Sequence, residues 1–197
     1  MQGGADAHLV EAPLASRVLA KGHFLEVRID DVRLPGGGTA TREYIHHPGA
    51  VAVVALLDDG SLLLERQYRH PVRRVMLEIP AGKIDPGEEL LACARRELLE
   101  ETGYTAREWA RAGSLHVAVG CSDEVIHLFF ARGLVHGAQQ LDDGEFIELT
   151  SLTEAELDAL AAHGEITDAK TLFGLQWLQR WRCGAWSLHW TSLPCGG

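Results

Sequence analysis

The N-terminal part of the chain contains short runs in which apolar and polar residues alternate. Over residues 25–29 every second side chain is apolar, which is the period of a half-buried β-strand. Further strands are expected at residues 41–46, 51–57 and 61–68. Turn residues at 58–60 predict that the last two strands form a hairpin. Residues 1–16 are small, polar and without a pattern, so no element is predicted there.

The apolar period lengthens after Asp85. Apolar residues three or four positions apart predict a helix over 86–101, with one apolar stripe made of Leu90, Leu91, Ala94 and Leu98. Asp85 is a suitable N-cap, and Pro86 suits the first helical position. Gly103 supplies the left-handed conformation in which helices commonly end.

The C-terminal part of the chain mixes strands and helices. Strand-like runs lie at residues 112–119, 125–131 and 146–149. A capping box of Thr153 and Glu156 opens one helix, and Asp168 caps a last one. On that last helix Trp177 and Trp181 are i, i+4 neighbours, which are expected to pack in the core or in a dimer contact. Strands before, between and after helices predict an α+β fold.

Composition limits the classes of protein to which the chain can belong. Among 197 residues, 46% are hydrophobic and 23% are charged, so the chain is expected to fold as one main globular domain. Lys and Arg number 18 against 28 Asp and Glu, a net charge of −10, which argues against nucleic acid as a partner. The four cysteines form no CxxC pair, and no apolar segment is long enough to cross a membrane. A cytoplasmic protein with reduced thiols and no membrane partner is expected.

Three carboxylates gather in the C-terminal half of the helix predicted after Asp85. Glu97 and Glu101 are i, i+4 neighbours, and Glu100 is i+3 from Glu97. These like charges repel one another and also meet the negative end of the helix dipole, unless a cation is bound. Mg²⁺ prefers such oxygen ligands and fills its remaining positions with water and substrate phosphate oxygens. The alternative is a solvated acidic face.

The carboxylates belong to a longer motif that spans 23 residues, from Gly82 to Tyr104. It fits the pattern of the Nudix box, which is G, five residues, E, seven residues and R-E-U-x-E-E-x-G-U, with U a bulky apolar residue. The fixed positions are filled by Gly82, Glu88, Arg96, Glu97, Leu98, Glu100, Glu101, Gly103 and Tyr104. By these residues the sequence resembles a Nudix hydrolase.

The resemblance implies an α/β/α sandwich around a mixed β-sheet, with a small N-terminal β region. The expected divisions are an N-terminal region at 1–48, which would be swapped in a dimer, a hydrolase domain at 49–182 and an uninterpreted tail at 183–197. The implied activity is hydrolysis of a nucleoside diphosphate linked to another group, with Mg²⁺ or Mn²⁺ as the cofactor. A family box identifies the chemistry better than the substrate.

The resemblance also assigns roles within the motif. Glu97 and Glu101 would be the principal metal ligands, Glu100 a further ligand, and the carbonyl of Ala81 would join them. In-line attack of water on phosphorus would then need no covalent nucleophile. Arg96 and Glu88 are expected to form an ion pair that orients the loop and the helix, the alternative being a surface salt bridge that contributes little.

Much of residues 41–178 resembles the ADP-ribose pyrophosphatase branch of the family. In that branch an acidic residue of the loop corresponding to residues 142–148 reaches the metals as a further ligand or general base. Glu145 is the first candidate and Asp143 the second. The alternative is an acidic loop that only keeps the surface soluble.

Other segments of this branch suggest substrate contacts. Arg69 corresponds to an arginine that contacts the diphosphate or its neighbouring ribose, although it could also merely balance the acidic chain. Glu78 matches the stretch that leads into the box, and Glu124 lies in a segment that lines the site. Arg42 and Glu43 resemble a pair that reaches the nucleobase bound by the neighbouring subunit, which implies a homodimer. The alternative is an ordinary exposed strand pair.

One position departs from the branch, because Val119 stands where a proline is usual in a turn about 15 residues after the box. The following glycine is present, so the turn could form without the proline. The first hypothesis is a pyrophosphohydrolase that cleaves ADP-ribose to AMP and ribose 5-phosphate. The alternatives are an enzyme for another nucleotide sugar, such as GDP-mannose, and a nonenzymatic nucleotide-sensing module.

Overall fold

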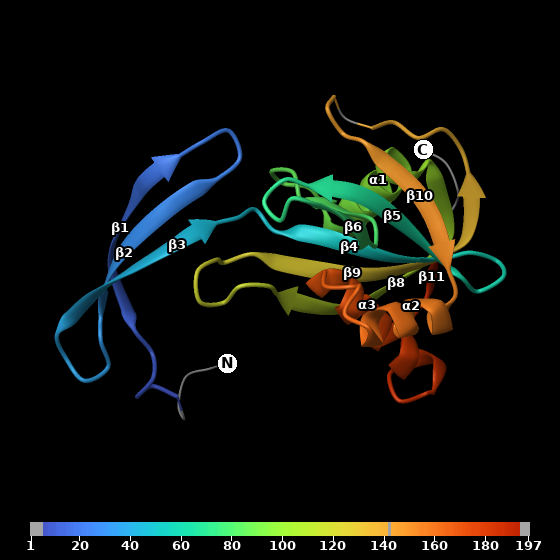
Figure 1. Cartoon of the computed structure of the whole chain (residues 1–197). Helices are drawn as coiled ribbons and strands as arrows, with labels where there is room; N and C mark the ends of the chain where they lie inside the picture. Colours follow the sequence, from blue (N-terminus) through green and yellow to red (C-terminus); the bar gives the residue numbers. More distant parts are fainter. Residues whose placement is uncertain (1–5, 142, 194–197) are drawn as a thin grey trace. The chain divides into compact units, whose positions relative to one another are not determined.

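The computed structural model describes residues 6–141 and 143–193, and it divides the chain into two compact units. The first unit contains the chain up to His47 together with His116–Glu124. The second unit contains Pro48–Leu115 and the chain from Val125 onward. Figure 1 shows the elements of both units, coloured along the sequence.

The first unit is a three-stranded antiparallel sheet. Its strands are β1 (Ala12–Lys21), β2 (Glu26–Arg33) and β3 (Thr39–His46), in that spatial order. The strands predicted at 25–29 and 41–46 are confirmed as β2 and β3. The assignment of residues 1–16 as unpatterned missed the start of β1, because Leu14 and Leu19 are extra residues where the register with β2 shifts. Each such bulge breaks the alternation by which a strand is recognised.

The second unit is built on an eight-stranded sheet. Six strands form the order β10-β5-β4-β9-β8-β11, while β6 pairs with β5 and β7 pairs with β4. The sheet is mixed, because β4 and β9 are parallel whereas β4 and β5 are antiparallel. Its strands are β4 (Ala50–Leu56), β5 (Leu62–Arg69), β6 (Arg74–Glu78), β7 (Ala81–Lys83), β8 (Tyr104–His116), β9 (Val125–His136), β10 (Ile147–Leu152) and β11 (Thr191–Ser192).

The five strands predicted in this unit are all present, although β8 begins at Tyr104 rather than near residue 112 and β9 continues to His136. The predicted 58–60 hairpin joins β4 to β5, as expected from its turn residues. Strands β6, β7 and β11 were not predicted. All three are short and have few residues in which a period could show.

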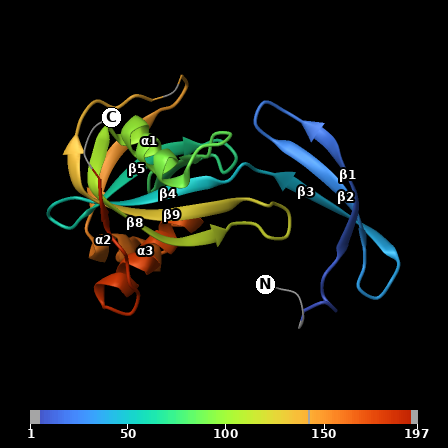
Figure 2. The same cartoon turned by 180° about the vertical axis from the view of Figure 1, so that it is seen from behind.

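Helices cover both faces of this sheet. In Figure 1 helix α1 (Leu90–Thr102) lies behind the sheet, with α2 (Glu154–Ala162) and α3 (Ala169–Arg182) in front, and Figure 2 shows the reverse. The predicted capping box opens α2, and the side chain of Asp168 caps α3. Among the described helices none is long and apolar enough to cross a membrane.

Helix α1 begins later than predicted. Asp85 does not cap it, because Asp85 and the three residues after it form a turn in which the Glu88 amide donates to the Asp85 carbonyl. Gly87 has φ of +80°, a conformation that an α-helix excludes. A Pro-Gly pair at the centre of a turn is typical of type II, and this local signal was misread as a helix start. The predicted end is confirmed, since Gly103 has φ of +73° and its amide donates to the Leu99 carbonyl.

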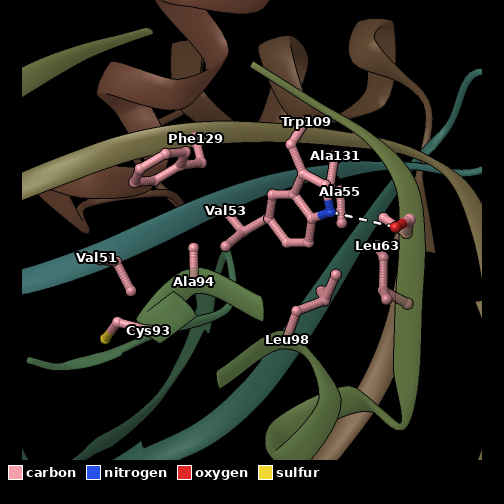
Figure 3. Packing of buried hydrophobic residues seen from close by; sticks show 11 residues of the cluster. Val51, Val53, Ala55, Leu63, Cys93, Ala94, Leu98, Trp109, Phe129 and Ala131 are labelled. Atoms are coloured by element: carbon pink, nitrogen blue, oxygen red, sulfur yellow. Dashed lines mark hydrogen bonds between the residues drawn. The ribbon is translucent and has the colours of Figure 1, made fainter. Parts of the chain in front are cut away.

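Alternate residues of β4 face the two layers of helices. Val51 and Val53 pack with Cys93, Ala94 and Leu98 of α1, and Trp109 from β8 fills the same cluster and donates its indole N–H to the Ala106 carbonyl (Figure 3). On the opposite face, a Cβ added to Gly174 of α3 would lie 3.0 Å from Val54, so helix and strand approach closely there. Burial of each large apolar side chain contributes about 1.5–3 kcal/mol. This core fixes α1 against the strands that carry the site.

Candidate metal centre and active site

The acidic side chains of α1 lie against the segment that follows β6 and forms β7. Glu101 is buried, with 6% of its surface exposed, and its Oε2 accepts the amide of Ala81 at 2.9 Å. Ala81 is itself held in the sheet by pairing with Ala52. Because α1 packs on β4 and β7 pairs with β4, the helix and β7 lie next to each other.

Gly82 gives the Glu97 side chain room to approach β7. A Cβ at Gly82 would lie about 2 Å from the carboxyl atoms of Glu97, which real contacts never show. The Glu97 carboxylate therefore fills the space that any other residue at position 82 would take. This contact gives a physical reason for the glycine that opens the box.

Arg96 connects the loop between β7 and α1 to the helix. Its Nε and Nη2 donate to the two carboxylate oxygens of Glu88, each at 2.9 Å, which confirms the predicted ion pair. Its Nη1 donates to Glu97 at 2.8 Å and to Glu100 at 2.9 Å. One guanidinium thus orients three carboxylates, and its bonds lower the pKa of Glu88 to about 2.

Burial governs the charge state of the two principal carboxylates. It raises the pKa of Glu101, and the nearby charge of Glu65 adds to this effect. Burial also raises the pKa of Glu97, partly opposed by Arg96. Glu145 raises the pKa of both, which places its carboxylate within electrostatic reach of Glu97 and Glu101. A cation at this position would favour the ionised forms of Glu97 and Glu101.

These residues fit a hard divalent cation by the chemistry of their donors. Glu97 and Glu101 offer partly or fully buried carboxylate oxygens, and the Gly82 backbone leaves the space into which Glu97 projects. Within residues 6–141 and 143–193, no three histidine, cysteine or acidic side chains already converge as a metal-ligand group. Arg96 and the Ala81 amide hold these carboxylates in their present positions.

A second charged network lies beside the carboxylates. Arg69 donates to both oxygens of Glu78, at 2.8 and 2.9 Å, and Lys170 of α3 bonds Glu78 and also pairs with Asp168 at 3.1 Å. Although burial opposes ionisation of Glu78, the bonds from Arg69 and Lys170 hold its pKa below the usual value. Two predicted substrate residues, Arg69 and Glu78, are thus bonded to each other.

The remaining predicted residues lie in two places. Glu145 is half-buried and Asp143 exposed in the loop before β10, while Asp142 lies outside the described residues. Arg42, Glu43 and Glu124 belong to the first unit. There Arg42 is paired with Glu11, and the Glu124 carboxylate lies 3.7 Å from the ring of His47.

The turn that contains Val119 forms without the proline that is usual in the ADP-ribose pyrophosphatase branch. The amides of Cys121 and Ser122 both donate to the Ala118 carbonyl at 2.9 Å, and Val119 is 82% exposed at the turn. Valine therefore does not prevent this backbone conformation.

The prediction from sequence overlooked Glu65 and Lys170. Glu65 is 2% exposed and Lys170 8% exposed, and both interact electrostatically with the residues described above. A charged residue directly after the apolar run Leu62–Leu64 was the available signal for Glu65. No local pattern marks Lys170, because its partner Glu78 is 92 residues away.

Comparisons with known proteins agree with this geometry. Residues 46–173 match the model described as NUDIX domain, and residues 12–45 match the model described as nucleoside diphosphate sugar hydrolase N-terminal domain. The chain belongs to the Nudix family. Both the family resemblance and the predicted fold class are thereby confirmed.

Relatives of this Nudix protein extend over most of its length. It is 39% identical over 173 residues to an ADP-ribose pyrophosphatase of Bacillus subtilis, covering 87% of this chain and 94% of that one. It is also 39% identical over 171 residues to a methanol dehydrogenase activator of Bacillus methanolicus, covering 86% and 92%. A crystal structure of an ADP compounds hydrolase shares the fold, with a TM-score of 0.79, 24% identity and coverage of 88% and 95%.

Proposed function

We propose that this Nudix protein is a divalent-cation-dependent pyrophosphohydrolase that cleaves ADP-ribose, or a related nucleoside diphosphate sugar, into a nucleoside monophosphate and a sugar phosphate. The observation that carries the proposal is the placement of Glu97 and Glu101, one turn apart on α1, against the Ala81–Gly82 backbone. The name of the Bacillus subtilis relative supports ADP-ribose as the substrate.

The cation in this proposal is Mg²⁺, with Mn²⁺ as a substitute. Glu97, Glu101 and Glu100 would hold it together with the carbonyl of Ala81. When bound, such a cation stabilises charge on the phosphoryl oxygens and promotes ionisation of the attacking water. Arg96 keeps the carboxylates of Glu97 and Glu100 oriented before the cation arrives, because it bonds both.

The chain's other residues would bind the substrate and accept a proton. Glu145 is the proposed proton acceptor, because it lies within electrostatic reach of both metal carboxylates, and Asp143 is the second candidate on the same loop. Arg69 would contact the diphosphate. Its bonds to Glu78 use Nε and Nη2, so this contact falls to Nη1, while Glu78 orients the guanidinium.

A homodimer in the cytoplasm completes the proposal. Large apolar side chains on and before β1 are 47–67% exposed in the first unit, namely Leu9, Val10, Leu14, Val18 and Leu19, and a second copy of the chain would cover them. Arg42 and Glu43 of this unit would then contact the nucleobase, and Glu124 would line the substrate site. The three cysteines described, Cys93, Cys121 and Cys183, are free thiols, in keeping with a reducing compartment.

A panel of substrates tests the reaction. Purified protein with Mg²⁺ is incubated with ADP-ribose, GDP-mannose, UDP-glucose, NADH and a nucleoside triphosphate, and products are separated by chromatography. We expect AMP and ribose 5-phosphate to form fastest from ADP-ribose. Faster cleavage of GDP-mannose would make GDP-mannose the assigned substrate. Tight binding of ADP-ribose without turnover would favour a nonenzymatic sensing module.

The variant Glu101→Gln tests the cation assignment. Glutamine keeps the size of the side chain but removes the charge and one ligand oxygen, so kcat should fall by about 100-fold or more at saturating Mg²⁺. The control is Glu108→Gln, which removes a half-buried partner of Arg132 in the same unit and should leave turnover unchanged. Equal turnover of wild type and Glu101→Gln would contradict the assignment.

A further inference from the structure

Glu65 is a buried carboxylate outside the family motif. It follows the apolar residues Leu62–Leu64 on β5, and only 2% of its surface is exposed. Its Oε1 is buried and accepts no hydrogen bond from any donor in the part of the chain that the structure describes. Buried polar atoms nearly always have a partner, so an unpartnered carboxylate oxygen needs an explanation.

The positively charged neighbours of Glu65 do not provide the missing hydrogen-bond partner. The cations of this region, Arg69 and Lys170, direct their hydrogen bonds to Glu78 and pair with acidic groups there. The group in hydrogen-bonding contact with Glu65 is instead the carboxyl of Glu101. Two carboxyl groups thus meet in the interior beside the position assigned to a cation.

This arrangement is unfavourable for the fold alone. Burying a carboxylate destabilises the fold unless the carboxylate is paired, and an apolar side chain of similar volume at this position would pack without that cost. Glu101 already has a hydrogen bond from the Ala81 amide, so it does not need Glu65 for its placement in the protein. A positive charge bound at Glu101 would give both carboxyl groups the partner they lack.

We propose that Glu65 is a positioning residue of the divalent-cation site, which acts through Glu101 and increases the affinity of the site for the cation. It contacts the Glu101 carboxyl and would add negative charge next to a cation bound there. Groups that support a metal ligand in this way commonly change metal affinity by 10- to 100-fold. This inference rests on the cation part of the proposed function and is independent of which nucleotide sugar is cleaved.

The variants Glu65→Gln and Glu65→Met test the proposal without substrate. Mn²⁺ affinity is measured from the electron paramagnetic resonance signal of the free ion, and thermal unfolding is followed in EDTA. Both variants should bind Mn²⁺ about tenfold or more weakly, because each removes the buried charge beside Glu101. Their unfolding midpoints in EDTA should equal or exceed that of the wild type, because each also removes a buried carboxyl group that has an unpartnered oxygen.

A matched control and two contrary outcomes make the test decisive. Glu108→Gln removes one half-buried carboxylate that pairs with Arg132 in the same unit, and it should not alter Mn²⁺ affinity. Mn²⁺ affinity within twofold of the wild type in the Glu65 variants would overturn the proposal. Failure of both variants to fold would also overturn it, since the fold itself would then require the carboxylate.

Different results would contradict the assignment of the cation site and the proposed role of Glu65. If wild type and Glu97→Gln bind Mn²⁺ equally, the assignment of the cation site to α1 is wrong. If Glu97→Gln weakens Mn²⁺ binding but the Glu65 variants do not, only the inference about Glu65 is wrong. Turnover of ADP-ribose enters neither comparison.

Discussion

Arg96 shows how one side chain organises the carboxylates of α1. Its guanidinium bonds Glu88 on the preceding loop and both Glu97 and Glu100 on the helix, so the loop cannot move independently of the acidic face. The resemblance to the Nudix box predicted the pair with Glu88, and in the structure α1 presents Arg96 toward the loop that precedes it. Glu65 could not be predicted in the same way, because its proximity to Glu101 depends on how β5 and α1 pack.

Replacement of Glu88 should remove an acid-dependent part of the stability. The pKa of Glu88 is about 2 in the folded chain, below the ordinary value of 4.5, because Arg96 bonds the ionised form. Its stabilisation is therefore complete above pH 4.5 and disappears as the pH falls toward 2. Glu88→Gln should lower the free energy of unfolding by about 1 kcal/mol at pH 7, after allowance for solvent screening.

Urea denaturation at several pH values provides the measurement. The difference between wild type and Glu88→Gln should shrink between pH 4.5 and pH 2. Glu89→Gln is the control, because Glu89 stands at the N-cap of α1 without a side-chain capping bond. A difference that stays constant across this range would show that the Glu88–Arg96 pair does not contribute in the folded protein.

At the scale of elements, the segment after α3 adds a short strand to the edge of the large sheet. Trp186 packs on Trp177, with ring centroids 4.4 Å apart, and Trp190 packs on Trp181 at 5.7 Å. Strand β11 then pairs with β8, and the Leu193 amide donates to the Arg107 carbonyl. Trp177 and Trp181 were expected in the core or in a dimer contact, and both pack within the chain, where Trp181 also contacts the buried Phe130. The tail itself, read as uninterpretable, continues the sheet.

Trp190 should contribute to stability without contributing to the reaction. It lies under the guanidinium of Arg132, 4.1 Å from the ring centroid, and against Trp181. Trp190→Ala should lower the free energy of unfolding by about 2 kcal/mol, from lost aromatic and cation–π contacts. Circular dichroism in urea measures this change, with Ser187→Ala as the control at an exposed position of the same segment. An unchanged midpoint would show that this segment is not held by its aromatic contacts.

At the scale of the whole molecule, the first unit leaves the apolar side chains of β1 exposed. Every residue of β1 is exposed, including Leu14, Val18 and Leu19. A three-stranded sheet has too few elements to cover both of its faces. The exposed strand is therefore the reason to expect a second copy of the chain.

An acidic residue on β1 should weaken that association. Wild type is expected to sediment with twice the 21.5 kDa mass of one chain, and Val18→Asp with the mass of one chain, because the interface would bury an unpaired charge. Thr39→Asp adds the same charge at an exposed polar position of β3 and serves as the control. Sedimentation of the wild type at the mass of a single chain, over the micromolar range, would contradict the dimer.

The sequence alone determined the features that depend on neighbouring residues. Helix α1, its end at Gly103 and the shared face of Glu97 and Glu101 follow from a period of 3.6 residues, and the box identified the family from the same local spacing. The caps of α2 and α3 are equally local, since Thr153 and Asp168 bond residues only three positions away. Such features depend on local spacing and not on which distant parts of the chain meet.

Only the tertiary structure decided what joins distant parts of the chain. Strand β1 is recognised by its pairing with β2, because its bulges hide the alternation. Lys170 meets Glu78 across 92 residues, and β11 closes on β8 from the far end of the chain. The meeting of Glu65 with Glu101 is of the same kind, because it depends on how a strand and a helix pack, and no spacing along the sequence encodes that distance.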